Sequence, residues 1–165
     1  MKNIIRDFAL ADGGRQKIEW VRKNMPVCRR LEEEFSRERP FDGLKLTVSV
    51  HLEAKTAYLA KVLAAGGASV AATGSNPLST QDDVAAGLAS EGIKVFAWHG
   101  ATPEEYESHI EAALSHGPDI IIDDGGDLVN MLHTKRKDLL PGVAGGCEET
   151  TTGVLRLKAM ERQGV

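Results

Sequence analysis

Short β-prone runs alternate with helical stretches from residue 44 onward, and this alternation restricts the possible folds more than any other feature. Four runs rich in β-branched and apolar residues are predicted as strands, with a weaker fifth: 46–50, 69–73, 94–98, 119–122 and 142–146. Strands separated by helices form parallel sheets covered by helices. The sequence therefore predicts an α/β fold built on a parallel, Rossmann-like sheet flanked by helices.

The first 40 residues carry a helical pattern instead. Ile18, Val21 and Arg22 follow Arg15 at helical spacing, and Pro26 suits the first turn of a second helix. We expect residues 1–40 to form an N-terminal helical arm and residues 41–165 to form the α/β domain.

Capping residues predict where several helices begin and end. Thr102, Pro103 and Glu105 have the spacing of a capping box, and Ser79 or Thr80 is predicted to cap a helix that starts near residue 82. Glycines are predicted to end three helices, at 66–67, 92 and 117.

Two further glycine pairs, Gly13-Gly14 and Gly145-Gly146, match neither GxGxxG nor GxxxxGK[ST]. Both are interpreted as turns. The chain has no dinucleotide-binding fingerprint of its own.

Composition argues against several classes of function. The formal charge of -4 arises from 20 basic and 24 acidic residues spread along the chain, which argues against a nucleic-acid partner. No apolar run approaches the roughly 20 residues that span a bilayer, so a soluble, cytoplasmic protein is expected. Neither the two cysteines nor the five histidines show metal-ligand spacing, and no metal is assigned.

Polar side chains follow each predicted strand. Ligands of open α/β sheets bind outside the carboxyl ends of the strands, so these residues are expected to share one edge. They are His51, Asn76, 79–82, Trp98, His99, Asp123, Asp124, Glu148 and Glu149.

Residues 123–127, with the sequence DDGGD, place three carboxylates and two glycines directly after an apolar strand. Clustered carboxylates need a ligand, hydrogen-bond donors or water, and glycines allow close backbone approach. A binding site is one interpretation. In the other, Asp127 caps the next helix and Asp123 lies in a solvated turn, and the spacing alone leaves both open.

Residues 148–153, with the sequence EETTTG, gather hydroxyl and carboxylate groups at a predicted helix start. An ordinary N-cap by Thr150 or Thr151, with glutamates complementing the helix dipole, is the alternative to a site. A lone histidine such as His51 is likewise more often structural than catalytic.

Taken together, several motifs resemble those of S-adenosylhomocysteine hydrolase, in that family's order along nearly the whole chain. The matching stretches are DFALA at 7–11, NMP at 24–26, STQD at 79–82, VFAW at 95–98, EEY at 104–106, DDGGD at 123–127, HTK at 133–135 and EETTTG at 148–153. DDGGD and EETTTG are the most specific of them.

The resemblance implies an enzyme that hydrolyses a nucleoside thioether through an internal redox cycle. Bound NAD oxidises the 3′-hydroxyl, homocysteine leaves by elimination, water adds at C5′, and the hydride is returned. By the same resemblance, Asp124 and Glu149 hold the ribose and assist proton transfer, and His51 lies near the departing group. Thr150, Thr151 and Thr152 match threonines that contact the nicotinamide end of NAD.

The chain departs from the common animal-type pattern after His51, where it has Glu53 and Lys55 in place of a threonine and a glutamate. The lysine ammonium and the N6 amino group of adenine are both hydrogen-bond donors, so they do not pair. Hypoxanthine instead offers an acceptor at O6 and a donor at N1. We therefore hypothesise an archaeal or thermophile-like member that accepts S-inosylhomocysteine. In the alternative, Glu53 and Lys55 pair with each other or face solvent.

The resemblance also implies that this is an N-terminal substrate-binding segment, because the family's NAD-binding domain does not occur within it. We expect the chain alone to be inactive and the complete enzyme to be a homo-oligomer, a tetramer by resemblance. A non-catalytic nucleoside-binding module or partner subunit is the alternative, and the reading frame after Val165 would distinguish the two.

Overall fold

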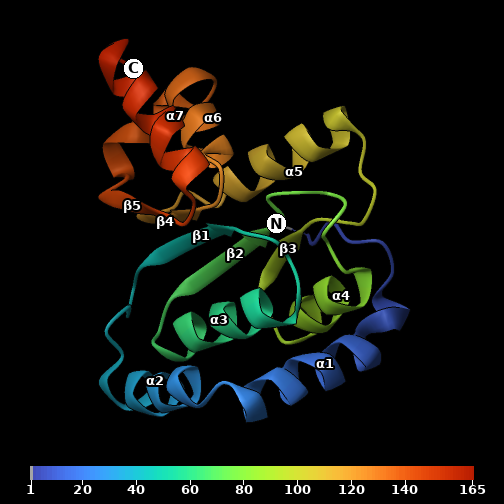
Figure 1. Ribbon diagram of the computed structural model, residues 1–165. Coiled ribbons are helices and arrows are strands. Elements are labelled where there is room, and N and C mark those ends of the chain that lie inside the picture. Colours follow the sequence, from blue (N-terminus) through green and yellow to red (C-terminus); the bar gives the residue numbers. More distant parts are fainter. Residues whose placement is uncertain (1) are drawn as a thin grey trace.

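A sheet of five parallel strands lies at the centre of the computed structural model, which describes residues 2–165 (Figure 1). The strand order is β3-β2-β1-β4-β5, and every neighbouring pair is parallel. The strands are β1 (Lys45–Ser49), β2 (Ser69–Thr73), β3 (Lys94–Phe96), β4 (Ile120–Asp123) and β5 (Gly145–Glu148). The predicted α/β class and parallel sheet are confirmed.

Strands β1 and β4 are shifted by one residue from their predicted ranges, and β3 and β5 differ by more. Strand β3 ends at Phe96 rather than at residue 98. Strand β5 begins at Gly145, because the 3-10 helix η2 (Lys137–Gly142) occupies the start of the predicted run at 142–146. Pro141 lies inside η2 and has no N–H to donate to a neighbouring strand.

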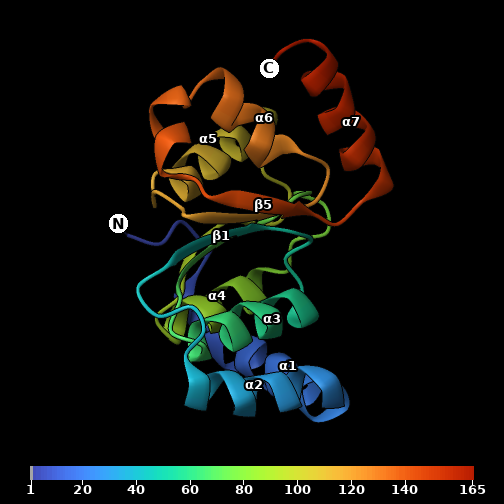
Figure 2. The same ribbon diagram turned by 90° about the vertical axis from the view of Figure 1, so that its left-hand side faces the viewer.

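Helices cover both faces of the sheet, as Figure 2 shows. On one side lie α1 (Ala11–Asn24), α2 (Pro26–Glu38), α3 (Ala54–Ala65) and α4 (Asp82–Ser90), with the short 3-10 helix η1 (Phe8–Leu10) before them. The other side carries α5 (Pro103–Leu114), α6 (Asp127–Thr134) and α7 (Thr151–Arg162). None of the helices described between residues 2 and 165 is long and apolar enough to cross a membrane.

The main hydrophobic core lies between the sheet and the α1–α4 side. Ile18 and Val21 of α1 are buried in the same cluster as Val48 of β1, Val70 of β2 and Leu88 of α4. Residues 8–38 are largely helical, which confirms the predicted N-terminal helical segment, and α1 packs as an outer layer on α3 and α4 (Figure 1).

Helix starts agree with the sequence at two positions and differ at a third. Thr102 and Glu105 form the predicted capping box of α5, and Thr150 accepts from Gly153 N to cap α7. Helix α4 instead starts after Gln81, without a side-chain cap bond from the described residues. The predicted cap by Ser79 or Thr80 is wrong, because both hydroxyls donate to the Asn76 carbonyl.

The interpretation of the two glycine pairs as turns is also wrong. Gly13 and Gly14 lie within α1, and Gly145 and Gly146 lie within β5. A Cβ atom at Gly14 would overlap the backbone carbonyl of Asp83, so this glycine lets α1 and α4 approach closely. Gly14 is therefore explained by the close packing of two helices and not by a turn.

Candidate active site

The sheet has a topological switch point between β1 and β4. From β1 the chain moves outward through β2 and β3, then returns to the other side of β1 as β4 and continues to β5. Crevices at such points, outside the carboxyl ends of the strands, are where open α/β sheets bind ligands. His51 follows β1 and Asp124 follows β4, so both stand beside the switch point.

His51 and Asp124 meet there. Nε2 of His51 lies 3.5 Å from Oδ2 of Asp124, and Nδ1 of His51 lies 2.5 Å from Oγ of Ser79. The side chain of His51 is 52% exposed, whereas that of Asp124 is 9% exposed. An accessible imidazole therefore sits over a sheltered carboxylate.

Ser75 is a site residue that the sequence interpretation missed. Its Oγ donates a hydrogen bond to Oδ2 of Asp124 at 2.8 Å. The signal was its position two residues beyond β2, next to the predicted Asn76. Ser75 holds the same oxygen that faces His51.

Trp98 and His99, also predicted at this edge, belong to another cluster. Arg6 stacks over the Trp98 ring at 5.5 Å and donates to the His99 carbonyl at 2.8 Å. The His99 amide donates to Asp82. These contacts join the N-terminal segment to the end of β3.

The alternative interpretation of residues 123–127 is wrong in both parts. Asp123 is fully buried rather than solvated, and it accepts backbone bonds from Asp124 and Val129 at 3.0 Å each. Burial raises its pKa to about 6. Asp127 is the first residue of α6, which begins after Gly126 in a left-handed conformation.

Asp127 instead ties the end of the loop to helices α5 and α7. Its carboxylate accepts from Tyr106 Oη at 2.9 Å and from Arg156 at 2.5 Å. The same phenol oxygen lies 2.9 Å from the Ser75 carbonyl, so its single proton is shared between two acceptors and joins the loops after β2 and β4. Neither Tyr106 nor Arg156 was predicted, because only the fold brings α5 and α7 to this loop.

Residues 148–153 follow β5, next to residues 123–127 at the end of β4. Asp123 of β4 pairs with Glu148 of β5, so Asp124 and Glu149 follow adjacent strand ends. The Glu149 amide donates to the Asp123 carbonyl at 2.9 Å, and the Glu149 side chain is exposed. Thr150 is engaged as the α7 cap, while Thr151 and Thr152 are exposed in the first turn.

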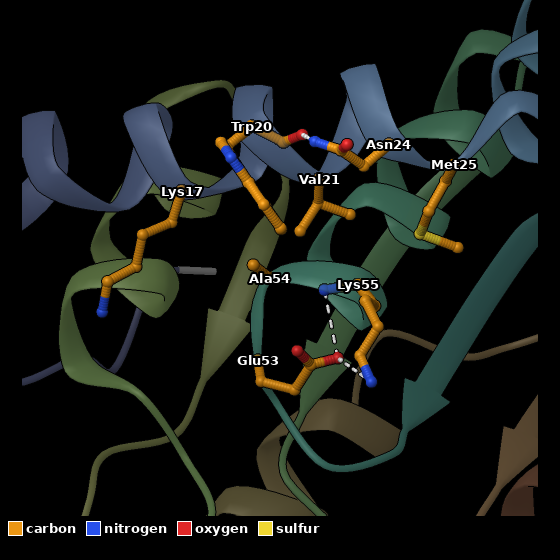
Figure 3. A pocket seen from close by; sticks show the side chains of 8 residues that line it. All are labelled: Lys17, Trp20, Val21, Asn24, Met25, Glu53, Ala54 and Lys55. Atoms are coloured by element: carbon orange, nitrogen blue, oxygen red, sulfur yellow. Dashed lines mark hydrogen bonds and ion pairs between the residues drawn. The ribbon is translucent and has the colours of Figure 1, made fainter.

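Glu53 and Lys55 line a groove of about 430 Å³ between α1 and the start of α3, shown in Figure 3. Trp20, Val21 and Met25 form its apolar side. Glu53 caps α3 by accepting from the amides of Lys55 and Thr56, and its Oε1 lies 4.0 Å from Nζ of Lys55. The predicted alternative, in which the two side chains pair, is thus present as a long ion pair.

A comparison with protein families gives one match that covers most of the chain. The profile of the S-adenosyl-L-homocysteine hydrolase family matches residues 2–140. The chain belongs to this family. The predicted resemblance is confirmed.

Relatives within the S-adenosyl-L-homocysteine hydrolase family carry two different names. The chain is 54% identical to the S-inosyl-L-homocysteine hydrolase of Methanocaldococcus jannaschii over 97% of its own length. It is 55% identical to that of Methanopyrus kandleri and 52% identical to the adenosylhomocysteinase of Pyrococcus abyssi, in each case over 98% of its length. It spans only 39%, 38% and 38% of these three proteins, respectively.

Among residues 2–165, no group of three or more His, Cys, Asp and Glu side chains is arranged to hold a metal ion. The polar groups of this family member at the switch point are a carboxylate, an imidazole and hydroxyls. Such groups can form hydrogen bonds with sugar hydroxyls, as donors or as acceptors, and can transfer protons.

Proposed function

We propose that this chain is the nucleoside-binding part of an enzyme that hydrolyses S-inosyl-L-homocysteine or S-adenosyl-L-homocysteine to the nucleoside and homocysteine. The observation that carries the proposal is the meeting of His51 and Asp124, 3.5 Å apart at the topological switch point. Membership of the family and the names of its relatives support the reaction class.

Asp124 is proposed to accept a hydrogen bond from a ribose hydroxyl. Ser75 holds its Oδ2 at 2.8 Å, which fixes the orientation of the carboxylate. His51 is exposed beside it, and its imidazole can pass a proton between the ligand and solvent. Glu149 emerges from the next strand end as a second carboxylate for the same sugar.

The first turn of α7 suits the polar end of NAD. The Thr150 hydroxyl already caps the helix, but Thr151 and Thr152 are exposed and can bond to a carboxamide. When bound, NAD would supply reversible oxidation of the 3′-hydroxyl. The residues of this chain would orient the sugar and move its protons.

The groove beside α3 is proposed to select the base. Lys55 offers a donor to O6 of hypoxanthine, and Glu53 offers an acceptor to N1–H. Both cap bonds of Glu53 end on Oε1, so Oε2 can serve a ligand. Trp20, 66% exposed on the groove wall, offers an aromatic face to a flat base.

A chimera tests both parts of this proposal. This chain replaces the matching segment of the Methanocaldococcus jannaschii relative, and homocysteine release is measured from the inosine and adenosine thioethers. We expect kcat/KM to favour inosine by about tenfold or more, since a mismatched donor pair costs on the order of 1–3 kcal/mol. The double variant Glu53→Thr, Lys55→Glu should reverse the preference.

Lys23→Glu is the control, because Lys23 is an exposed lysine of α1 that does not line the groove. It should leave the preference unchanged. A strong adenosine preference in the unmodified chimera would exclude the assignment of the base. A folded chimera that binds nucleoside but releases no homocysteine would favour a non-catalytic module.

A further inference from the structure

One carboxylate oxygen joins the two loops that carry the candidate acids. Oε1 of Glu148, at the end of β5, accepts from the amides of Gly125 and Thr150 at 2.8 and 2.9 Å. The Thr150 hydroxyl donates to the same oxygen at 2.8 Å. Glu148 thus bridges residues 123–127 and the start of α7.

The surroundings keep this carboxylate ionised. Burial raises its pKa, but hydrogen bonds from the backbone amides of Gly125, Thr150 and Gly126 and from the Thr150 hydroxyl outweigh burial, so the pKa lies below its ordinary value. Its other oxygen, Oε2, is buried without a hydrogen-bond partner among residues 2–165. The bonds to the two loops therefore define where the carboxylate sits.

The backbone on both sides is shaped around Glu148. Gly125 and Gly126 have φ angles of 99° and 79°, a left-handed conformation that suits glycine, and the Gly125 amide donates to Glu148. A Cβ atom at Gly153 would overlap the Glu148 carboxylate. Gly153, in the first turn of α7, thus makes room for the half-buried Glu148 side chain.

The groups held in this way are direct neighbours of the candidate acids. Asp124 precedes Gly125, and Glu149 lies between Glu148 and Thr150. We propose that Glu148 is a positioning residue, which holds Asp124 and Glu149 in register across the ends of β4 and β5. The consequence for nucleoside binding rests on the proposed function, whereas the register itself does not.

The experiment uses the 165-residue chain and the variants Glu148→Ala and Glu148→Gln. Amide hydrogen exchange by NMR reports on Gly125 and Thr150, and calorimetry gives the dissociation constant for inosine. Glu148→Ala removes the acceptor, so the amides of Gly125 and Thr150 should exchange about tenfold faster. The same variant should bind inosine about tenfold more weakly. Glutamine keeps a carbonyl that can accept the same bonds, so Glu148→Gln should recover both values to within about threefold.

Glu161→Ala removes an exposed carboxylate from α7 and is the matched control. Protection of the buried strand residues Thr47 and Val48 verifies that each variant is folded. Unchanged exchange at Gly125 and Thr150 in Glu148→Ala would overturn the proposal. So would lost protection at both amides with unchanged inosine affinity, which would leave Glu148 a purely local role.

The two proposals fail differently. If the unmodified chain binds neither inosine nor adenosine, nucleoside binding by this segment is wrong. The exchange measurement needs no ligand and still decides whether Glu148 holds the two loops together.

Discussion

Oδ2 of Asp124 receives Ser75 Oγ at 2.8 Å and faces Nε2 of His51 at 3.5 Å, so one carboxylate oxygen connects the loops after β1, β2 and β4. These three strands are neighbours in the sheet, with β1 between the other two. The contact exists because parallel strands end at one edge and because the chain reverses its direction of travel at β1.

Asp124→Asn should weaken the binding of inosine to this chain by roughly 10- to 100-fold. Hydrogen bonds to a charged group are worth on the order of 1.5–3 kcal/mol, and the amide also loses the attraction of the carboxylate for His51. Titration calorimetry measures the change. Asp138→Asn, at an exposed ion pair with Arg136, is the control and should have no effect. Equal affinities for the two variants would remove Asp124 from the site.

Asp123 should make the chain more stable as the pH falls from about 7 toward 4. Its pKa in the folded chain is raised from 3.8 to about 6, chiefly by burial. In this range the folded form takes up a proton before the unfolded form does, and a shift of about two units corresponds to roughly 3 kcal/mol. Urea unfolding at pH 7.5 and pH 5 measures the free energy of unfolding.

Asp123→Asn removes this titration and should lose the associated pH dependence. It should also be less stable at low pH, because an amide has one acceptor oxygen for the two amides of Asp124 and Val129. The measurement compares how the free energy of unfolding changes with pH in this variant and in the unmodified chain. Identical slopes would mean that Asp123 is not shielded from water.

His116 should act in the opposite direction. Burial, followed by the nearby lysines, lowers its pKa from 6.5 despite a bond to the Ser69 carbonyl. Its ring accepts from Lys94 Nζ at 3.0 Å and donates to Ser69 at 2.8 Å, so protonation would set donor against donor. As the pH falls below about 6.5 the unfolded chain is protonated first, and stability is lost.

His116→Gln should therefore flatten the loss of stability between about pH 6.5 and 5. His133→Gln, at a partly exposed position on α6, serves as the control. Because Asp123 and His116 oppose each other, the unmodified chain alone is uninformative, and each variant is compared with it by urea unfolding. If the free energy of unfolding of His116→Gln depends on pH in the same way as that of the control, the ring of His116 is not buried in its neutral form.

The sequence predicted the features that depend on local pattern and chain order. The sheet and the polar edge that carries His51 and Asp124 follow from strand spacing and the rule for ligand sites, whereas the contact between the two side chains was not predicted. Ser75, Tyr106, Arg156 and the bridging role of Glu148 were missed, because their partners are distant in sequence. Their bonds depend on loop conformation and on how α5 and α7 lie against the loop that follows β4.

Gly13 and Gly14 show the same limit and provide a matched pair of variants. Glycine is unfavourable within a helix by about 0.5–1 kcal/mol relative to alanine. At Gly13 the nearest atom to a new Cβ would be a side-chain oxygen of Asp83 at 3.7 Å, so Gly13→Ala should stabilise the chain by about that amount. At Gly14 the new Cβ would meet the Asp83 backbone, which cannot rotate away.

Gly14→Ala should therefore cost about 1–3 kcal/mol or more, because α1 and α4 must separate. Gly87→Ala should have a similar effect from the other helix, since its Cβ would lie 2.7 Å from the Arg15 nitrogen. Thermal and urea unfolding of the three variants measure the free energy of unfolding. Equal stability of Gly13→Ala and Gly14→Ala would mean that α1 does not pack closely on α4, and Ile18 and Val21 would then lose their place in the core.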